Sequence, residues 1–130
     1  MKAISRGIAA VAAVLVMATG AQASEGLMCE GKGATVDVAL GRLVIVGVLG
    51  AYVEVGGNSY STGPERGEGI PIITGQAFGD DDGIKIDFVD SNVEEILVKV
   101  RLTYTGNEDE PLAGTVTAGD VTADIACMAG

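Results

Sequence analysis

The chain has 130 residues, with 18 acidic and 8 basic side chains, and its formal net charge at pH 7 is −10. It has no histidine, which excludes histidine-dependent catalytic triads and histidine-ligated zinc or copper sites. Its acidity disfavours binding to nucleic acid or to anionic membrane surfaces. The charge instead favours solubility, or a cationic protein or peptide as the partner.

The segment 1–23 has the three parts of a secretory signal peptide. Lys2 and Arg6 give a basic start, an apolar run covers 8–17, and small residues precede a cleavage position after residue 23. The apolar run is shorter than the roughly 20 residues that a membrane-spanning helix needs. We therefore expect a periplasmic or secreted protein with one folded domain over 24–130 and a net charge of −12, because six basic residues then face all eighteen acids. A retained membrane anchor is the alternative.

The two cysteines, Cys29 and Cys127, lie near the two ends of the predicted domain. Export would place them in an oxidising compartment, so we expect one disulfide bond between them. Its role is expected to be structural, because redox function usually needs a close pair such as Cys-x-x-Cys.

Strands account for most of the remaining pattern. Apolar and polar side chains alternate over 34–40, over 84–88 and most clearly over 96–105, which is the period of a half-buried strand. The run 43–55 is almost continuously apolar, with two glycines that offer positions for a bend or bulge. A buried helix is the competing interpretation of this run, but its valines, isoleucines and glycines favour a strand.

Glycine-containing turns separate these segments. We expect hairpin turns at 56–58 and at 119–120, and surface loops at 62–71 and 106–111. Seven or eight short strands with such turns predict an all-β fold, a small antiparallel β-sandwich or barrel that follows the signal-peptide helix.

The stretch 79–95 holds seven carboxylates and one lysine. The acids of Asp80-Asp81-Asp82 are contiguous, and no part of the stretch has the spacing of an EF-hand loop. We expect these three residues to form a solvated hairpin tip, because successive side chains cannot all face a core. Ser91-x-x-Glu94 resembles a capping box, which predicts a single helical turn before the strand at 96.

Carboxylate chemistry is the catalysis that the composition leaves open, as an acid and base pair or a hard-metal site. A glycosidase usually also presents aromatic platforms, yet the chain has five aromatic residues and no tryptophan. We expect no enzymatic activity and no cofactor. A calcium site made by Asp80, Asp82, Asp90 and Glu94 is a further alternative, and it requires the two acidic groups to meet at one rim.

Two resemblances bear on function. The run GQAFGDDDGIKIDFVDSNVEEILVKVRL, with MCEGKG upstream and a cysteine near the end, resembles a group of small exported alphaproteobacterial proteins without an assigned activity. The plan of signal peptide, acidic small β-domain and end-to-end disulfide is similar to that of periplasmic lysozyme inhibitors with a small β-barrel. Those inhibitors carry a Ser-Gly-x-x-Tyr type loop, whereas this chain has Ser61-Thr62-Gly63-Pro64 with no tyrosine behind it.

The sequence thus predicts an exported, non-catalytic binding or structural module. The alternatives are an inhibitor or scavenger of a cationic protein such as lysozyme, and a calcium-supported module. Six acids in two predicted turns are the candidate partner-binding residues: Asp80, Asp81, Asp82, Glu108, Asp109 and Glu110.

Overall fold

The computed structural model describes residues 24–42 and 46–129, so the predicted signal peptide lies outside the described residues. The described residues form ten β-strands and no helix, which confirms the all-β prediction. The strands are β1 (Ser24–Gly31), β2 (Ala34–Arg42), β3 (Val46–Val55), β4 (Asn58–Ser61), β5 (Ile70–Pro71), β6 (Ile73–Gly79), β7 (Gly83–Val89), β8 (Ile96–Tyr104), β9 (Leu112–Ala118) and β10 (Val121–Ala129). The predicted seven or eight strands were too few, because β1 and the two-residue β5 were missed.

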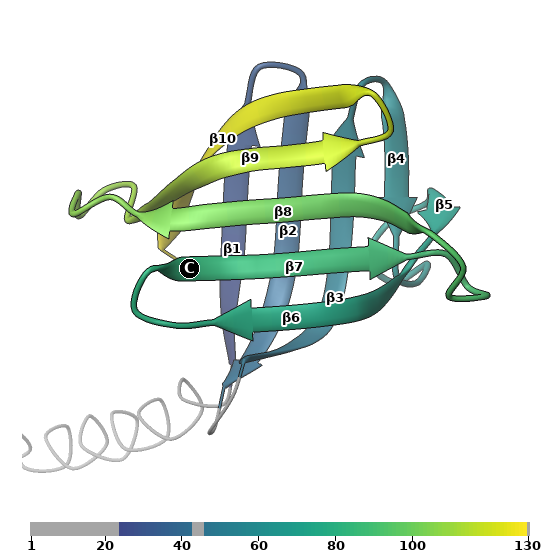
Figure 1. Ribbon diagram of the computed structural model, residues 1–130, viewed down its shortest axis with the longest axis horizontal. Helices are drawn as coiled ribbons and strands as arrows, with labels where there is room; N and C mark the ends of the chain where they lie inside the picture. The colour runs from purple at the N-terminus through teal and green to yellow at the C-terminus, as the bar shows by residue number, and fades with distance from the viewer. Residues whose placement is uncertain (1–23, 43–45, 130) are drawn as a thin grey trace, which may run out of the picture.

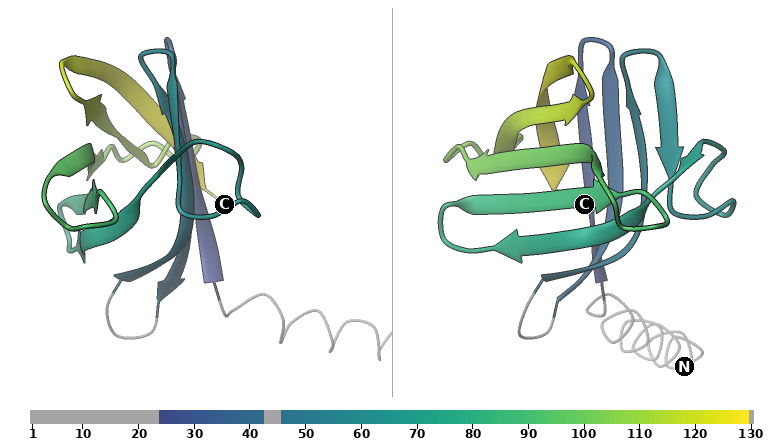
Figure 2. Two further views of the ribbon diagram at one scale, coloured as in Figure 1. Left: turned by 90° about the vertical axis from the view of Figure 1, so that its right-hand side faces the viewer. Right: turned by 45° about the vertical axis from the view of Figure 1, so that its right-hand side comes forward.

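All ten strands belong to one sheet in the order β5-β4-β3-β2-β1-β10-β9-β8-β7-β6. Neighbouring strands are antiparallel except β4 and β5, which are parallel. The sheet curls into a nearly closed, barrel-like shape in which β6 to β9 form a front layer that crosses β1 to β4 behind it (Figures 1 and 2). Front and back layers therefore share one interior.

Alternating side chains fill that interior. In β8, Val98, Val100 and Leu102 are buried between more exposed neighbours, as the alternation predicted. Full burial of a valine, leucine or isoleucine side chain contributes about 1.5–3 kcal/mol. The largest fully buried side chains come from both layers: Phe88, Leu40, Ile72, Ile84, Ile86, Val36, Val38, Val53, Val55, Val98, Val100 and Val116.

Of the predicted apolar run 43–55, the part over 46–55 is strand β3 with a bulge, as its glycines indicated, and 43–45 lie outside the described residues. Ala39 of β2 pairs with Gly50, but the next residue pairs with Val48, so Leu49 has no partner and its side chain is 64% exposed. A Cβ atom on Gly50 would lie 2.7 Å from Nε of Arg66, which packs over the strand at this point. Glycine therefore lets the 62–71 loop approach β3 closely.

Glycines adopt left-handed backbone conformations in the two turns that the sequence predicted to be hairpins. Gly56 and Gly57, between β3 and β4, have φ values of 63° and 83°, and Gly119, between β9 and β10, has a φ of 61°. Left-handed backbone of this kind suits two-residue hairpin turns, because their twist matches that of the flanking strands.

The disulfide joins the two ends of the domain. Cys29 of β1 lies directly opposite Cys127 of β10, and the two residues are bonded and fully buried in the core. The bond spans 98 residues of sequence and links two adjacent strands at the middle of the sheet.

Replacement of both cysteines by alanine is expected to lower the free energy of unfolding by about 4–5 kcal/mol. Without the bond, the unfolded chain of the variant regains the entropy that closure of a long loop removes. Urea denaturation of the oxidised protein and of the double variant measures the difference. Intact mass of the unreduced protein should be two hydrogens below that of the dithiol form. Two alkylatable thiols in natively exported material would contradict the pairing.

Candidate functional site

Candidate sites lie on the outside of the molecule, because apolar side chains occupy the interior. One shallow depression of about 540 Å³ is lined by residues of the 62–71 loop and by Ser61. A second, of about 460 Å³, lies between the β1–β2 and β3–β4 turns. Glycines and short polar side chains supply much of both linings, and neither depression gathers a set of reactive groups.

The Asp80–Asp82 segment is a hairpin tip, as predicted. Oδ1 of Asp80 accepts hydrogen bonds from the main-chain N–H groups of Asp82 (2.8 Å) and Gly83 (3.1 Å). The N–H of Asp80 donates to the carbonyl of Gly83 at 3.0 Å. The first aspartate therefore fixes the turn, and the other two are left exposed to solvent.

The β8–β9 loop is fixed in a similar way. Oδ1 of Asn107 accepts from the N–H groups of Asp109 (2.8 Å) and Glu110 (3.3 Å). The hydroxyl of Thr105 donates to the carbonyl of Glu110 at 2.6 Å. The acidic side chains of this loop are exposed on a hydrogen-bonded frame.

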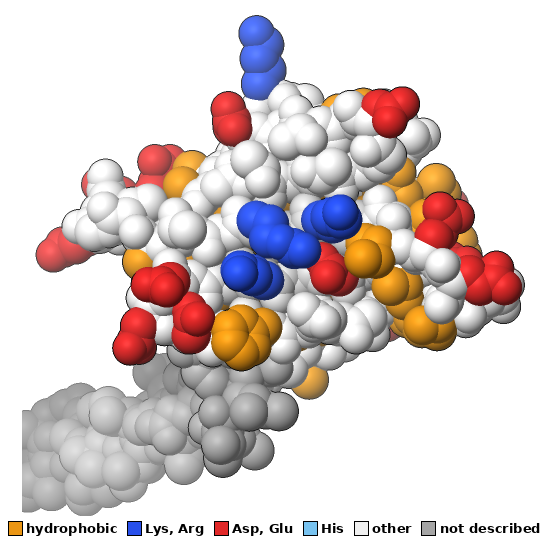
Figure 3. Space-filling model, in the orientation of Figure 1, with side chains coloured by type: hydrophobic (Ala, Val, Ile, Leu, Met, Phe, Trp, Pro, Cys, Tyr) orange, Lys and Arg blue, Asp and Glu red, His pale blue; other side chains and the backbone are white. Residues whose placement is uncertain are grey.

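The two acidic turns lie at the same end of the front layer. The N–H of Tyr104, the last residue of β8, donates to the carbonyl of Asp82 at 3.1 Å, so the β8–β9 loop begins beside the β6–β7 tip. Acidic side chains gather at this end of the molecule, on the left in Figure 3. We call the six predicted partner-binding acids, Asp80 to Asp82 and Glu108 to Glu110, the acidic rim.

The turn between β7 and β8 lies at the opposite end. Oδ1 of Asp90 accepts from the N–H groups of Glu94 (2.7 Å) and Glu95 (3.2 Å), and residues 91–93 form a turn rather than a helix. The predicted helical turn is therefore wrong, because the side chain of Asp90, not that of Ser91, takes the free amides. Val93 in this turn has a φ of 59°, a left-handed conformation that is strained for a β-branched side chain.

The four candidate calcium ligands are not brought together. Asp80 and Asp82 precede β7, whereas Asp90 and Glu94 follow it, and a seven-residue strand is roughly 20 Å long. One ion cannot bind both groups. Within residues 24–42 and 46–129, no three His, Cys, Asp or Glu side chains are grouped in a way that could hold a metal.

The outer face of the front layer carries a group of basic side chains that the sequence analysis missed. Lys85 of β7 lies opposite Arg101 of β8, and Lys99 of β8 lies opposite Asp87 of β7. Their neighbours along each strand are buried, so all four side chains belong to the outer face. The basic side chains form one cluster at the centre of Figure 3, and we call Lys85, Lys99 and Arg101 the cationic face.

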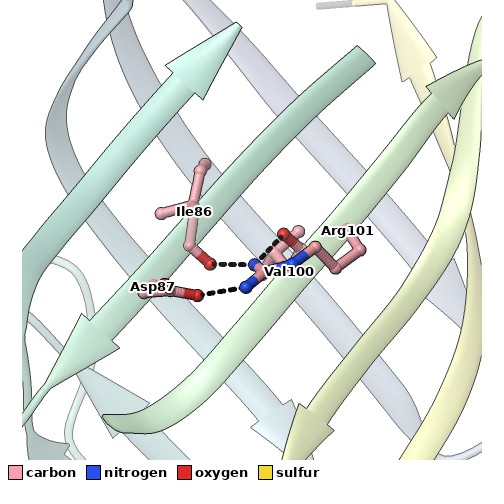
Figure 4. A network of polar contacts seen from close by, with 4 residues as sticks. All are labelled: Ile86, Asp87, Val100 and Arg101. Atoms are coloured by element: carbon pink, nitrogen blue, oxygen red, sulfur yellow. Dashed lines mark hydrogen bonds and ion pairs between the residues drawn. The ribbon is translucent and has the colours of Figure 1, made fainter. Parts of the chain in front are cut away.

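Asp87 and Arg101 form the central ion pair of this face. Nη2 of Arg101 lies 2.8 Å from Oδ1 of Asp87, and Nη1 donates to the carbonyls of Val100 (3.0 Å) and Ile86 (3.3 Å) (Figure 4). Oδ1 of Asp87 is buried and accepts no hydrogen bond of good geometry. The 2.8 Å contact with Arg101 is therefore an ion pair without an aligned hydrogen bond. The side chain of Asp87 is 12% exposed and that of Arg101 is 39% exposed.

Comparison with models of protein families, with curated proteins and with solved structures found no match to this chain. The two resemblances drawn from sequence therefore stay predictions. The described part of the chain includes no helix of the length and apolar character needed to cross a membrane.

Arg101→Gln is expected to lower the free energy of unfolding by about 1–2 kcal/mol. The substitution leaves the Asp87 carboxylate buried without its partner, and the partial exposure of Arg101 reduces the cost that a fully buried pair would have. Chemical denaturation checks this. Lys99→Gln, on the same strand, is the control and should change stability by less than about 0.5 kcal/mol. If Arg101→Gln and Lys99→Gln lower the free energy of unfolding equally, the ion pair does not stabilise the fold.

Val93→Asn is expected to raise the free energy of unfolding by about 1 kcal/mol, because asparagine tolerates the left-handed backbone that strains valine. Little apolar burial is lost, since Val93 is 65% exposed. Thermal and urea denaturation measure the gain. A less stable variant would mean that Val93 makes a contact that outweighs its backbone strain.

Proposed function

We propose that the protein is an exported, non-catalytic binding module that acts through its outer surface. The observation that carries this proposal is the separation of charge over a filled core. The interior of the sheet is occupied mainly by apolar side chains. On the outside, acids gather at the ends of the front layer, and the basic side chains cluster at its centre around the single carboxylate of Asp87. A surface of this kind supports recognition of a charged partner more readily than conversion of an enclosed substrate.

The disulfide is compatible with the proposed periplasmic or extracellular location, because such bonds persist in oxidising compartments. It also supports the idea of a rigid scaffold, since the bond joins two adjacent strands at the middle of the sheet. A rigid scaffold lowers the entropy lost when its surface loops bind a partner.

A cationic protein such as lysozyme is the second and more specific candidate, as the partner of the acidic rim. The rim supports it because two turns more than twenty residues apart in sequence present their acids side by side on hydrogen-bonded frames. The hydrogen bonds of Asp80 and Asn107 hold the main chain of both turns, so little main-chain freedom is lost on binding, and the summed field of the acids would accelerate association with a basic surface. The proposal is thus an electrostatically steered complex, and inhibition would follow only if the rim covers the partner's own site.

Association with lysozyme, measured by surface plasmon resonance at low and at physiological salt, tests this candidate. We expect fast association that slows with salt, because the Debye length falls to about 8 Å at physiological ionic strength. The triple variant Asp80→Asn, Asp81→Asn, Asp82→Asn should slow association about tenfold or more. It should still fold, since asparagine keeps the Oδ1 acceptor that fixes the turn.

A matched triple variant, Glu65→Gln, Glu68→Gln, Asp120→Asn, removes three exposed charges outside the rim and is the control. If both triple variants slow association equally, net charge rather than the rim is responsible. If the unmodified protein binds no basic protein at low salt, the cationic partner is excluded and the acids serve solubility.

A further inference from the structure

We infer that the cationic face is a second binding site, and that its ligand is an acidic oligosaccharide, a short chain of sugars that carry carboxylates. The inference does not depend on the acidic rim or on its partner. It rests on the two rows of side chains that the strand register places on the outer face of β6 to β9.

The first row crosses the four strands as Phe78, Lys85, Arg101 and Thr115. The second row crosses them as Gln76, Asp87, Lys99 and Thr117. Directly opposed residues on paired strands share a face, so each row is a line of neighbouring side chains. Phe78 is 52% exposed, which leaves an aromatic ring open to solvent beside Lys85.

The charges of this array do not cancel. Among the described residues, the one ion pair of the face joins Arg101 to Asp87. Lys99 lies opposite the same carboxylate without forming an ion pair, so the three cations and one carboxylate leave a net charge of +2. Three cations gather on one sheet face of a chain in which acids outnumber bases by 18 to 8. One carboxylate does not balance three neighbouring cations, and charge complementarity therefore points to an anionic ligand.

The size and surroundings of the face exclude extended or bulky anions. Four strands at a spacing of about 4.8 Å span roughly 15 Å, so two rows cover only about 200 Å². A stable protein interface buries about 800 Å² on each partner. Nucleic acid and anionic membranes would extend over the acidic rim and meet the strongly negative field of the rest of the molecule.

The free chemical groups distinguish a sugar from an acidic peptide. Extended peptides are usually bound by main-chain hydrogen bonds at a sheet edge. The three cations lie on β7 and β8, which are paired on both sides, and the one free edge of this face belongs to β6, which carries none of them. The groups that remain on the face are ammonium, hydroxyl, amide and aromatic side chains. Ammonium groups bind carboxylates, hydroxyl and amide groups bind sugar hydroxyls, and an exposed ring packs against the apolar face of a sugar.

The test is a titration of the ¹⁵N-labelled, disulfide-bonded protein with tetragalacturonate, followed by amide chemical shifts. The expected result is a set of shifts confined to β6 to β9, with affinity that falls as salt rises. The double variant Lys85→Gln, Lys99→Gln should weaken binding about 5- to 20-fold, since exposed ion pairs contribute modestly one by one. Phe78→Ala should weaken it about threefold or more, because the stacking surface is lost.

Two matched comparisons make the test specific. The methyl ester of the same tetrasaccharide keeps the sugars but removes the charges, and should bind about tenfold more weakly. Lys32→Gln removes an exposed cation far from the face and should leave affinity within twofold, whereas Lys99→Gln should weaken binding about two- to fivefold.

Several results would overturn the inference. These are no shifts on the front layer, equal binding of the ester, or equal losses for Lys32→Gln and Lys99→Gln. Hexaglutamate that binds the same residues as tightly as the sugar would show that the ligand is an acidic peptide instead. All the substituted side chains are exposed, and an unchanged amide spectrum in the free state confirms that the variants fold.

Discussion

The pairing of β1 with β10 is the contact on which the rest of the sheet depends. It places the two ends of the domain side by side and lets two meanders, β2 to β5 and β9 to β6, extend in opposite directions. A slip of one residue between β1 and β10 would turn the inward side chains of one strand outward. The buried bond between Cys29 and Cys127 prevents that slip, because only directly opposed cysteines can keep it.

The closed core also determines where charge can lie. Among the described residues, the buried side chains are apolar except Ser61 and Asp87, so ionised groups are confined to turns and to the outer face. The turns at one end use Asp80 and Asn107 as main-chain acceptors and expose further acids. The outer face of β7 and β8 instead holds Lys85, Lys99 and Arg101. Segregation of charge is therefore a consequence of strand period and turn chemistry together.

Much of the fold could be predicted from the sequence, because the alternation of apolar and polar side chains in a strand is a local pattern. Alternation predicts β8, and three contiguous acids predict the hairpin tip at Asp80. The cysteine pair follows from the oxidising compartment that the signal peptide predicts. β5 was missed because it pairs with β4 only through the return of the 62–71 loop, which no alternation pattern indicates. The cationic face was missed for the same reason, since Lys85 and Arg101 become neighbours only through a register that no local pattern contains.

The acidic rim and the cationic face share one rigid scaffold, and their proximity limits how strongly two ligands can influence each other. Lys85 follows Asp82 by three residues, which corresponds to roughly 10 Å along β7. Two unit charges at that distance interact by about 0.4 kcal/mol in water, and salt at physiological strength screens most of this. A cation bound at the acidic rim would raise the affinity of the cationic face for an anion, and the anion would raise the affinity of the rim for the cation by the same factor. Both effects would be weak. The two proposed sites would therefore bind partners of opposite charge almost independently, and one small domain would then connect a basic protein to an acidic sugar.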